Sequence, residues 1–348
     1  MPAPLKSAIV TIGLPVFNGV ELVPETLRAI RDQTFQNYRV LVSVDGDDQA
    51  SAVACRPFLN DTRIELVVRQ ERLGWARNLN SLIERCQSAF FCYWQQDDLA
   101  DTSYLERLVE HAVSHPEAAC SYADVQWFGS AINRKEQPSI TGPALDRALA
   151  ALFAPANWIP FRGLIRGDAL RKVGPLRTGH AMSSLEDKTW VVKLAGEGEL
   201  HRVPKTLYFK RAHATSTHKV WHGWPADQRR EAWLTHGVGL LEVLLPLAGR
   251  EERPRVLAKV VDRLLGLEQR GWRFYDGIHE KEAFVTDLLR MVEGSVIAPA
   301  VKEAGAAIVK ADSAQLGVAM AVCRAGFLEV GELLVMAGSK SCGVGNER

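Results

Sequence analysis

Two adjacent carboxylates, Asp97 and Asp98, follow directly after an aromatic run that begins at Phe91. Two acids side by side repel each other, and a bound divalent cation removes that repulsion. Mg²⁺ and Mn²⁺ commonly bind one or two carboxylates together with the oxygens of a diphosphate. The pair therefore predicts a metal site for a nucleotide substrate. A second interpretation stays open, because aspartate also caps helices and a helix is expected from Thr102.

A second acidic turn, Asp45-Gly46-Asp47-Asp48, lies earlier in the chain. A fixed carboxylate at Asp45 is suited to accept hydrogen bonds from a nucleobase or a ribose. For Asp47 and Asp48 we favour a structural interpretation, in which they shape a tight turn and cap the next helix.

The segment from Arg72 to Asn78 brings a glycine and two guanidinium groups to the start of a predicted helix. Backbone N–H groups at a helix start and arginine side chains both bind phosphate, so this segment is a candidate phosphate cradle. Arg77 is the candidate donor-binding residue, and a plain surface position is the alternative for it.

Glu186 and Asp187 lie at the start of a later predicted helix. A carboxylate within reach of an attacking hydroxyl can act as its general base. Ser183 and Glu186 also fit the S-x-x-E pattern of a capping box, which would explain the glutamate structurally. Asp187 is the residue that such a cap does not explain.

Residues 210–224 are polar and rich in histidine and tryptophan, and they are expected to form a loop. One hypothesis is a lid in which His213 contacts a metal and Trp221 and Trp224 stack on a sugar. His218 and His222 fit H-x-x-x-H, but no cysteine or acid completes a zinc set, so we treat them as surface residues.

Short apolar runs alternate with amphipathic segments through the first 128 residues. The apolar runs are rich in β-branched and aromatic residues and predict strands, whereas helical spacing of apolar residues predicts the segments between them. Such alternation is typical of a mainly parallel α/β sheet flanked by helices. The predicted strands cover residues 8–14, 39–44, 63–68, 90–94 and 118–128.

Polar residues follow the first, second and fourth of these strands, at positions 15–18, 45–48 and 96–98. Right-handed crossovers place those strand ends along a common edge of the sheet. Open α/β sheets bind their ligands at that edge. The coincidence of the three segments predicts a single site.

The pattern weakens between residues 130 and 160, where several prolines interrupt it. Order returns with a helix that begins near Glu186 and a strand near 200–209. Beyond Pro225 the spacing is helical, in segments 232–247, 256–267 and 283–292. We therefore expect an α/β domain over 1–224, with a nucleotide-binding half (1–128) and an acceptor half (129–224). An α-helical region over 225–348 could mediate oligomerisation.

The overall composition is ordinary for a globular protein, at 47% hydrophobic and 24% charged residues, with a formal net charge of +1. That balance gives no electrostatic reason to expect nucleic acid as a partner. The six cysteines are scattered and fit reduced core thiols. No signal peptide or uncharged membrane-length segment is apparent. We expect a soluble cytoplasmic protein and leave peripheral membrane contact open.

These motifs, in this order, resemble the family 2 glycosyltransferases, which have the GT-A fold. Pro15-Val16-Phe17-Asn18 matches the family's P-x-[YF]-N, and Val44-Asp45-Gly46-Asp47 is similar to its D-D-G-S turn. Arg72–Asn78 is similar to its N-x-G-x-x-x-A-x-N region, and Gln96-Asp97-Asp98 to its D-x-D motif. Glu186-Asp187 matches its E-D motif, and Tyr208–His213 its Y-x-R-x-H segment. The resemblance covers the chain to about Thr217.

The resemblance implies an inverting transferase in which Asp187 is the general base and Asp98, with His213 as a further contact, binds Mn²⁺ or Mg²⁺. It implies that Asp97 lies at the ribose or the metal and that Asp45 holds the base. Val44 and Gln96 stand where the family usually has acids, so the nucleotide is not specified. The remaining donor-site residues are Pro15, Phe17, Asn18 and Arg77, and those of the acceptor site or lid are Glu186, Arg211, Trp221 and Trp224.

The predicted function is non-processive transfer of one sugar from a UDP-, GDP- or dTDP-sugar to a glycan, a lipid-linked acceptor or a small molecule, as in polysaccharide biosynthesis. The lack of membrane spans argues against a synthase that exports its own polymer. Two alternatives remain. One is a different nucleotide-sugar enzyme, such as a nucleotidyltransferase, although Pro15–Val20 lacks the Gly-rich loop that it needs. The other is a non-catalytic nucleotide-sugar binder or a scaffold that uses the C-terminal helices.

Overall fold

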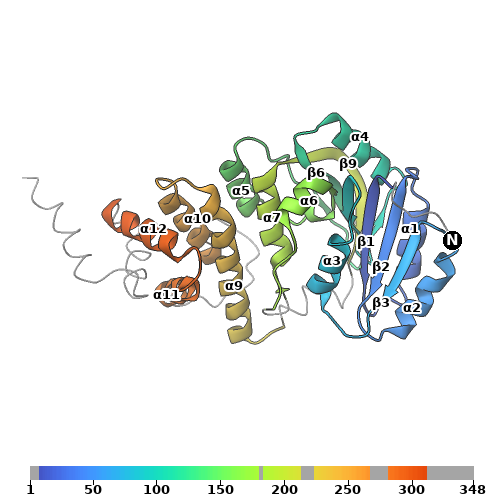
Figure 1. Ribbon diagram of the computed structural model, residues 1–348, viewed down its shortest axis with the longest axis horizontal. Helices are drawn as coiled ribbons and strands as arrows, with labels where there is room; N and C mark the ends of the chain where they lie inside the picture. The colour runs from blue at the N-terminus through green and yellow to red at the C-terminus, as the bar shows by residue number, and fades with distance from the viewer. Residues whose placement is uncertain (1–7, 180–182, 213–222, 267–280, 312–348) are drawn as a thin grey trace, which may run out of the picture. The chain divides into compact units, whose positions relative to one another are not determined.

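The computed structural model describes residues 8–179, 183–212, 223–266 and 281–311. The chain divides into two compact units, Met1–Val220 and Trp221–Arg348. The first unit is an α/β domain with a single nine-stranded sheet, and the described part of the second is helical (Figure 1). The predicted combination of an α/β sheet with C-terminal helices is confirmed.

Four parallel strands form the first half of the sheet, in the order β3-β2-β1-β4. The chain builds outward from β1 to β3 and then returns to place β4 on the other side of β1. The crossover helices α1 and α2 lie on one side of the sheet and α3 lies on the other (Figure 1). The reversal makes the gap between β1 and β4 a topological switch point, where open α/β sheets bind ligands. The bounds are β1 Val10–Val16, α1 Val23–Arg31, β2 Tyr38–Val44, α2 Gln49–Cys55, β3 Ile64–Val68, α3 Trp75–Ile83 and β4 Phe90–Tyr93.

Strand β1 continues through Pro15, where the sequence pattern predicts its end. Alternate residues of β1 bond to opposite neighbours, and the Gly13 carbonyl accepts from the Trp94 N–H on the β4 side. Pro15, two residues after Gly13, faces the same side of β1. Its missing N–H therefore points toward β4, whose pairing with β1 ends at Tyr93. No ladder hydrogen bond is lost, and the proline is tolerated inside the sheet.

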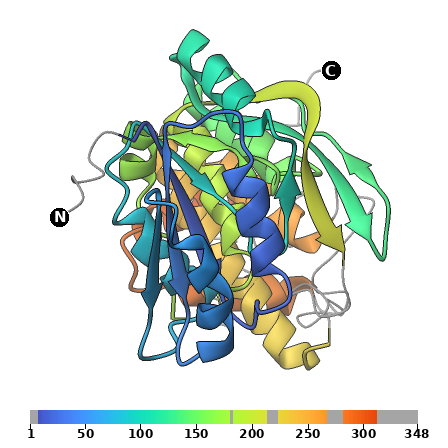
Figure 2. The same ribbon diagram turned by 90° about the vertical axis from the view of Figure 1, so that its right-hand side faces the viewer.

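The second half of the sheet is mixed. Strands β8 and β6 continue from β4 in antiparallel fashion, β9 pairs parallel with β6, and β5 and β7 add short antiparallel edges. The β6–β9 pairing has register shifts where Ala123 opposes Val203 but Asp124 opposes Thr206, so Pro204 and Lys205 bulge out. Figure 2 shows β9 in yellow as a long, strongly bent strand, as expected at bulges. The bounds are β5 Leu99–Ala100, β6 Ala118–Gly129, β7 Arg134–Lys135, β8 Leu164–Arg166 and β9 Glu199–Ala212.

The remaining helices of the first unit pack against this half. Helix α4 packs on β6, α6 on β8, and α7 on α5. Helix α5 lies in the stretch where the prolines suggested no regular structure, and it begins directly after Pro143, a residue that helix starts tolerate. The bounds are η1 Arg56–Phe58, α4 Tyr104–Ser114, α5 Ala144–Phe153, η2 Pro160–Arg162, α6 Gly167–Val173 and α7 Glu186–Glu197.

Residues 210–212 differ from the loop that their polar sequence suggests, because β9 extends through them to Ala212. They pair in parallel with the end of β6. The rest of the predicted loop up to residue 222 lies outside the described residues.

The described part of the second unit is helical, as the spacing predicts. Helix α9 packs against α10 and α11, and α10 packs against α12. The Trp233 indole N–H donates to the Leu264 carbonyl at 2.8 Å, which fixes α9 on α10. None of the described helices is long and apolar enough to cross a membrane. The bounds are α9 Ala226–Leu244, η4 Leu245–Leu247, α10 Arg253–Leu265, α11 Lys281–Val292 and α12 Ala298–Ala311.

Replacing Gly13 by alanine should destabilise the protein, because the added methyl carbon would lie 2.6 Å from Cζ of Phe91 in the neighbouring strand. Overpacking of this kind costs about 1–3 kcal/mol in the free energy of unfolding, measured by urea denaturation. Combining Gly13→Ala with Phe91→Leu, which shortens the obstructing side chain, should cost less than the sum of the two single changes. Strictly additive losses would show that the two residues do not compete for this space.

Candidate active site

The ends of β1 and β4 are joined at the switch point by the side chain of Gln96. Its Nε2 donates to the Phe17 carbonyl at 2.8 Å, and its Oε1 accepts from the Phe17 N–H at 2.8 Å. A carboxylate could make only the second bond, because it has no hydrogen to donate. A Cβ on Gly19 would lie 2.6 Å from Gln96 Oε1, so this close approach requires glycine. Gln96, which stands where an acid was expected, therefore fixes the loop after β1.

A pocket of about 410 Å³ opens beside this loop. One wall is the aromatic ring of Phe17, over which the Arg72 guanidinium lies at 3.7 Å from the ring centroid. A flat, weakly hydrated guanidinium on an aromatic face forms a stack that a planar heterocycle can join or replace. The pocket is lined by Phe17, Asn18, Arg72 and residues 45–50.

Asp45 is buried at the base of this pocket. Its two carboxylate oxygens accept from the backbone N–H groups of Leu73 and Gly74, at 2.7 and 2.9 Å. These bonds tie the end of β2 to the loop that leads into α3. A carboxylate has about four lone-pair positions, so Asp45 keeps acceptor capacity beyond the two bonds to this loop.

Asp48 forms the opposite rim and has the structural task expected for it. Its Oδ1 accepts from the Ser51 N–H at 3.1 Å and so caps α2, while its Oδ2 accepts from the Asn18 N–H at 2.7 Å. Burial acts to raise the pKa of Asp48, but the bonds from Ser51 and Asn18 outweigh it and lower that pKa. Asn18 has a positive φ of 49°, which asparagine tolerates better than most residues.

Asp98 lies on the other side of the Gln96 bridge and is completely buried, with 0% of its surface exposed. Its Oδ2 accepts from the Tyr208 hydroxyl at 3.0 Å, and its Oδ1 accepts from the Arg211 N–H at 2.9 Å. The Nε of Arg162 lies 3.5 Å from Oδ2. Burial raises the pKa of Asp98, against the pull of the nearby Lys210 and Arg162. In this state the carboxylate anchors the acidic turn to β9 and η2, which differs from the open metal ligand that the sequence suggests.

Arg211 holds the same turn from the outside. Its Nε donates to the Asp97 carbonyl at 3.0 Å, and its guanidinium forms an ion pair with Glu25 on α1 at 2.5 Å. The guanidinium also lies 4.5 Å from the Phe128 ring centroid. Asp97 is partly exposed, in contrast to the buried Asp98.

Two further cations, Arg162 and Lys210, face the acidic residues from η2 and β9. Arg162 is buried, and its Nη2 donates to Gln95 Oε1 at 2.5 Å. Burial, together with the neighbouring Arg162, lowers the pKa of Lys210, whereas Asp98, Asp97 and Asp187 act to raise it. Asp187 of α7 acts in the same direction as these acids, to raise the pKa of both cations.

Asp187 lies in the first turn of α7, after a stretch of unusual backbone. Ser183 and Leu185 both have positive φ, at 53° and 62°, a conformation that costs non-glycine residues energy and that often marks functional sites. Asp187 Oδ1 is buried and has no hydrogen-bond partner among the residues that the structure describes. Burying an acceptor in this way is costly, so the atom is a candidate for contact with a substrate.

The predicted capping box at this helix is wrong. Leu185 is the residue that precedes α7, and no side chain caps the helix there. Glu186 is instead buried, with its Oε1 3.7 Å from Nη1 of Arg177. This carboxylate is therefore held by an ion pair within the domain.

Comparison with known proteins identifies the family of this domain. Residues 11–174 match the model of the family described as glycosyl transferase family 2. The chain contains a family 2 glycosyltransferase domain. This segment covers the switch-point loops, both acidic turns and Arg162, whereas Asp187, Tyr208 and Arg211 lie beyond it.

Named relatives of this glycosyltransferase domain are distant. The glycosyltransferase GlyA of Streptococcus pneumoniae is 26% identical over 106 residues, which are 30% of this chain and 15% of GlyA. An uncharacterized glycosyltransferase of Haemophilus influenzae is 26% identical over 125 residues, 35% of this chain and 38% of that protein. The chain thus matches well under half of the length of either relative.

The fold also matches that of a solved glycosyltransferase. Residues 1–349 of S. aureus TarS, crystallised with UDP-GlcNAc, superpose with a TM-score of 0.63 at 12% identity, covering 97% of this chain and 93% of that one. The predicted GT-A fold is confirmed by this likeness.

The structure gathers most of the predicted donor-site residues but separates some others. Pro15 lies within β1, and Phe17, Asn18 and Asp45 line the pocket. Arg72 lines the pocket, whereas Arg77 is exposed on α3. His213 and Trp221 lie outside the described residues, and Trp224 belongs to the second unit.

Three residues of this site were not identified from the sequence: Arg162, Lys210 and Tyr208 as partners of the acidic turn. Tyr208 and Lys210 lie in the Y-x-R-x-H segment, which is their sequence signal. Strand β9 contains this segment as far as Ala212. Arg162 lies in an irregular stretch after the prolines, and no local pattern marks it.

Asp98→Ala should destabilise the protein strongly, because it would leave Arg162 buried without its carboxylate partner. Breaking a buried ion pair from one side costs about 3–5 kcal/mol in the free energy of unfolding. The matched change Asp97→Ala, at the partly exposed neighbour, should cost less than about 1 kcal/mol. Urea denaturation followed by circular dichroism measures both, and equal losses in the two variants would contradict the anchoring role of Asp98.

Proposed function

We propose that the protein is an inverting glycosyltransferase that moves a sugar from a nucleoside-diphosphate sugar to an acceptor hydroxyl, with Asp187 as the general base. The observation that carries the proposal is the buried Oδ1 of Asp187 without a hydrogen-bond partner among the described residues. A base must offer a lone pair to the proton that it removes, and this oxygen offers one. In an inverting reaction the acceptor oxygen attacks the sugar carbon directly and its proton passes to this carboxylate.

The pocket beside β1 and β2 is suited to the nucleoside. A flat base stacked on Phe17 would take the place beside Arg72, and Asp45 could accept from a base N–H at the pocket floor. Asn18 and the backbone of residues 45–50 supply polar groups for the ribose. In this assignment the base lies on the β2 side of the switch point and the diphosphate extends toward the acidic turn.

Three cations near the acidic turn fit the charge of the leaving group. Arg162, Lys210 and Arg211 contact or face Asp97 and Asp98 and would stabilise the negative charge that develops on the departing diphosphate. The half-buried Lys210 lies among acidic residues and has three N–H donors for phosphate oxygens. These side chains can act on the diphosphate with or without a metal.

The acidic turn has the oxygen-donor chemistry that Mg²⁺ and Mn²⁺ prefer. Both oxygens of Asp98 already accept hydrogen bonds within the domain, so we assign the cation chiefly to the partly exposed Asp97, with Asp98 behind it. The described residues bring no third carboxylate or imidazole to metal-ligand spacing there. Diphosphate oxygens and water would complete the coordination, and His213 remains a predicted further ligand. A bound cation would neutralise charge on the leaving diphosphate.

The donor nucleotide and the acceptor are the least constrained parts of the proposal. The TarS structure with the same fold was solved with UDP-GlcNAc, which makes a UDP-sugar the first donor to test, followed by GDP- and dTDP-sugars. We propose a carbohydrate or glycolipid acceptor and transfer of one sugar per encounter. Glu186 and Arg211 are proposed for the acceptor side, and Trp221 and Trp224 for a lid.

Asp187→Asn should lower kcat for sugar transfer by about 10²–10⁴-fold, because the amide cannot take the proton of the attacking hydroxyl. Donor affinity, measured by calorimetry, should change little, since the variant keeps the size of the side chain. Asp146→Asn is the matched control, because Asp146 also lies in the first turn of a helix in the same domain but is exposed. Full transfer activity in Asp187→Asn would refute the assignment of the base.

A binding screen of UDP, GDP and dTDP should identify one preferred nucleotide, and Phe17→Ala should weaken its binding by about 1–3 kcal/mol through loss of the stack. Arg72→Ala should also weaken binding, whereas Arg56→Ala, an exposed arginine on η1, should not. Isothermal titration calorimetry measures the three variants. Equal affinity in Phe17→Ala and the unchanged chain would exclude this pocket as the base site.

The same titrations with and without Mn²⁺ test the cation. If Asp97 holds it, the gain in affinity that Mn²⁺ gives the unchanged chain should disappear in Asp97→Ala. A gain that persists in this variant would return the assignment to Asp98 and His213.

A further inference from the structure

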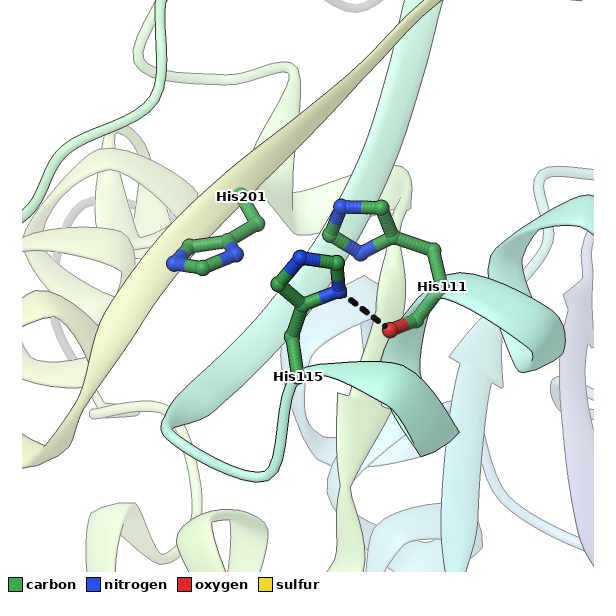
Figure 3. Close-up of side chains that lie close together, drawn as sticks. All are labelled: His111, His115 and His201. Atoms are coloured by element: carbon green, nitrogen blue, oxygen red, sulfur yellow. Dashed lines mark hydrogen bonds between the residues drawn. The ribbon is translucent and has the colours of Figure 1, made fainter.

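Three histidine side chains from two distant parts of the chain lie close together within the first unit, away from the acidic turn. His111 lies in the last turn of α4, His115 directly follows that helix, and His201 lies on β9 (Figure 3). The rings of His111 and His115 stack with centroids 4.0 Å apart, and both lie edge-on to His201 at 5.5 and 5.3 Å. One ligand nitrogen from each ring lies within 4.8 Å of the other two.

Hydrogen bonds fix which nitrogen is available on two of the rings. His115 Nδ1 lies 2.9 Å from the His111 carbonyl, which can only accept, so Nδ1 carries the hydrogen and Nε2 keeps its lone pair. His201 Nε2 lies 2.8 Å from Glu199 Oε2, an acceptor when ionised, so Nδ1 keeps its lone pair. Donation of the second ring N–H to a carbonyl or a carboxylate is the usual outer-sphere arrangement of metal-binding histidines.

The third ring is held in a similar way. His111 Nδ1 lies 3.0 Å from the Ser121 hydroxyl on β6, which can accept from it and leave Nε2 with a lone pair. Neutral imidazole is the form that binds a metal.

Acidic groups adjoin the three histidines. Carboxylate oxygens of Glu117 and Glu199 lie within 4.8 Å of each other and of a His201 nitrogen. The site also lies at the C-terminal end of α4, where the helix dipole favours a cation. Zn²⁺ takes imidazole nitrogen together with carboxylate oxygen in a tetrahedral set, whereas Mg²⁺ prefers oxygen alone.

The simplest alternative is that the histidines only cap α4. Arg166 Nη2 already donates to two carbonyls at this end of the helix, those of Ala112 and His115, at 2.6 and 3.2 Å. Capping also gives no reason for His201, on a different element, to meet the other two rings. Convergence from two elements, with two lone pairs fixed by hydrogen bonds, is more specific than capping requires.

From these contacts we infer that His111, His115 and His201 bind Zn²⁺ or a similar transition-metal ion. A tetrahedral zinc spaces its ligand atoms about 3.3 Å apart, so nitrogens that lie within 4.8 Å of one another would close in by at most about 1.5 Å on binding. The site is separate from the donor site. His201 lies near the start of β9, whereas Arg211, which contacts the acidic turn, lies near its end, ten positions later.

The test is a zinc titration of the full chain after its metal has been removed by a chelator and its purification tag has been cut off. Competition with a chromogenic zinc indicator should show one equivalent bound with a Kd of about 1 µM or tighter. Saturating Zn²⁺ should also raise the melting temperature, because it binds the folded chain. Millimolar Mg²⁺ should neither compete nor stabilise through this site. No stoichiometric binding, or binding only at millimolar zinc, would overturn the inference.

Variants locate the bound zinc. His115→Gln and His201→Gln should each weaken zinc binding by about 100-fold or more, and Glu199→Gln by about 10–100-fold through loss of the outer-sphere carboxylate. The double change His218→Gln/His222→Gln removes the other H-x-x-x-H pair of the sequence and should leave the affinity unchanged. Circular dichroism checks that each variant is folded. If the double change abolishes binding while His115→Gln and His201→Gln retain it, the proposed site is wrong.

Discussion

The buried carboxylate of Asp98 is the interaction on which the arrangement of the site depends. It joins three segments that are distant in sequence: the turn after β4, the end of β9 through Tyr208 and Arg211, and η2 through Arg162. A charge in that position is stable only while each of these partners is present. The conformation of the turn that carries Asp97 therefore depends on the correct folding of the second half of the sheet around it.

The charge balance of the site follows from the same constraint. Acidic residues at the carboxyl edge of the sheet face cations supplied by η2 and β9. Such a preorganised set of opposite charges can hold a diphosphate without large rearrangement, since its dipoles are already oriented. The pocket beside Phe17 is built separately, by the hydrogen bonds of Gln96 and Asp45 to neighbouring loops. The pocket and the charged cluster thus rest on different parts of the first unit.

How much of this could be predicted from the sequence depends on the range of the interactions. The parallel strands were visible because each is a local run of β-branched residues, and the site edge followed from the polar residues after them. Helix α5 was missed because the prolines around it were taken as breakers, although Pro143 precedes a helix without disrupting it. The strand character of residues 210–212 was missed because it depends on pairing with β6, far away in the chain.

The site residues also divide into those marked by a local motif and those whose role depends on contacts distant in sequence. Asp45, Asp97, Asp98 and Asp187 were found from motifs, but their burial was not, and burial is what distinguishes Asp98 from Asp97. Arg162 has no local signal at all. His111 and His115 show i, i+4 spacing in the sequence, yet only the fold reveals that His201 faces them.

The bulges of β9 have a consequence for how this domain can vary. Pro204 and Lys205 are exposed and make no ladder pair with β6, so their side chains could change freely. The number of residues in this stretch, by contrast, could not change. Side chains alternate across a strand, so removing one residue would turn Tyr208 to the opposite face of the sheet and away from Asp98. We therefore expect homologous chains to differ in composition at this surface stretch while its length stays constant, a rare combination for solvent-exposed backbone.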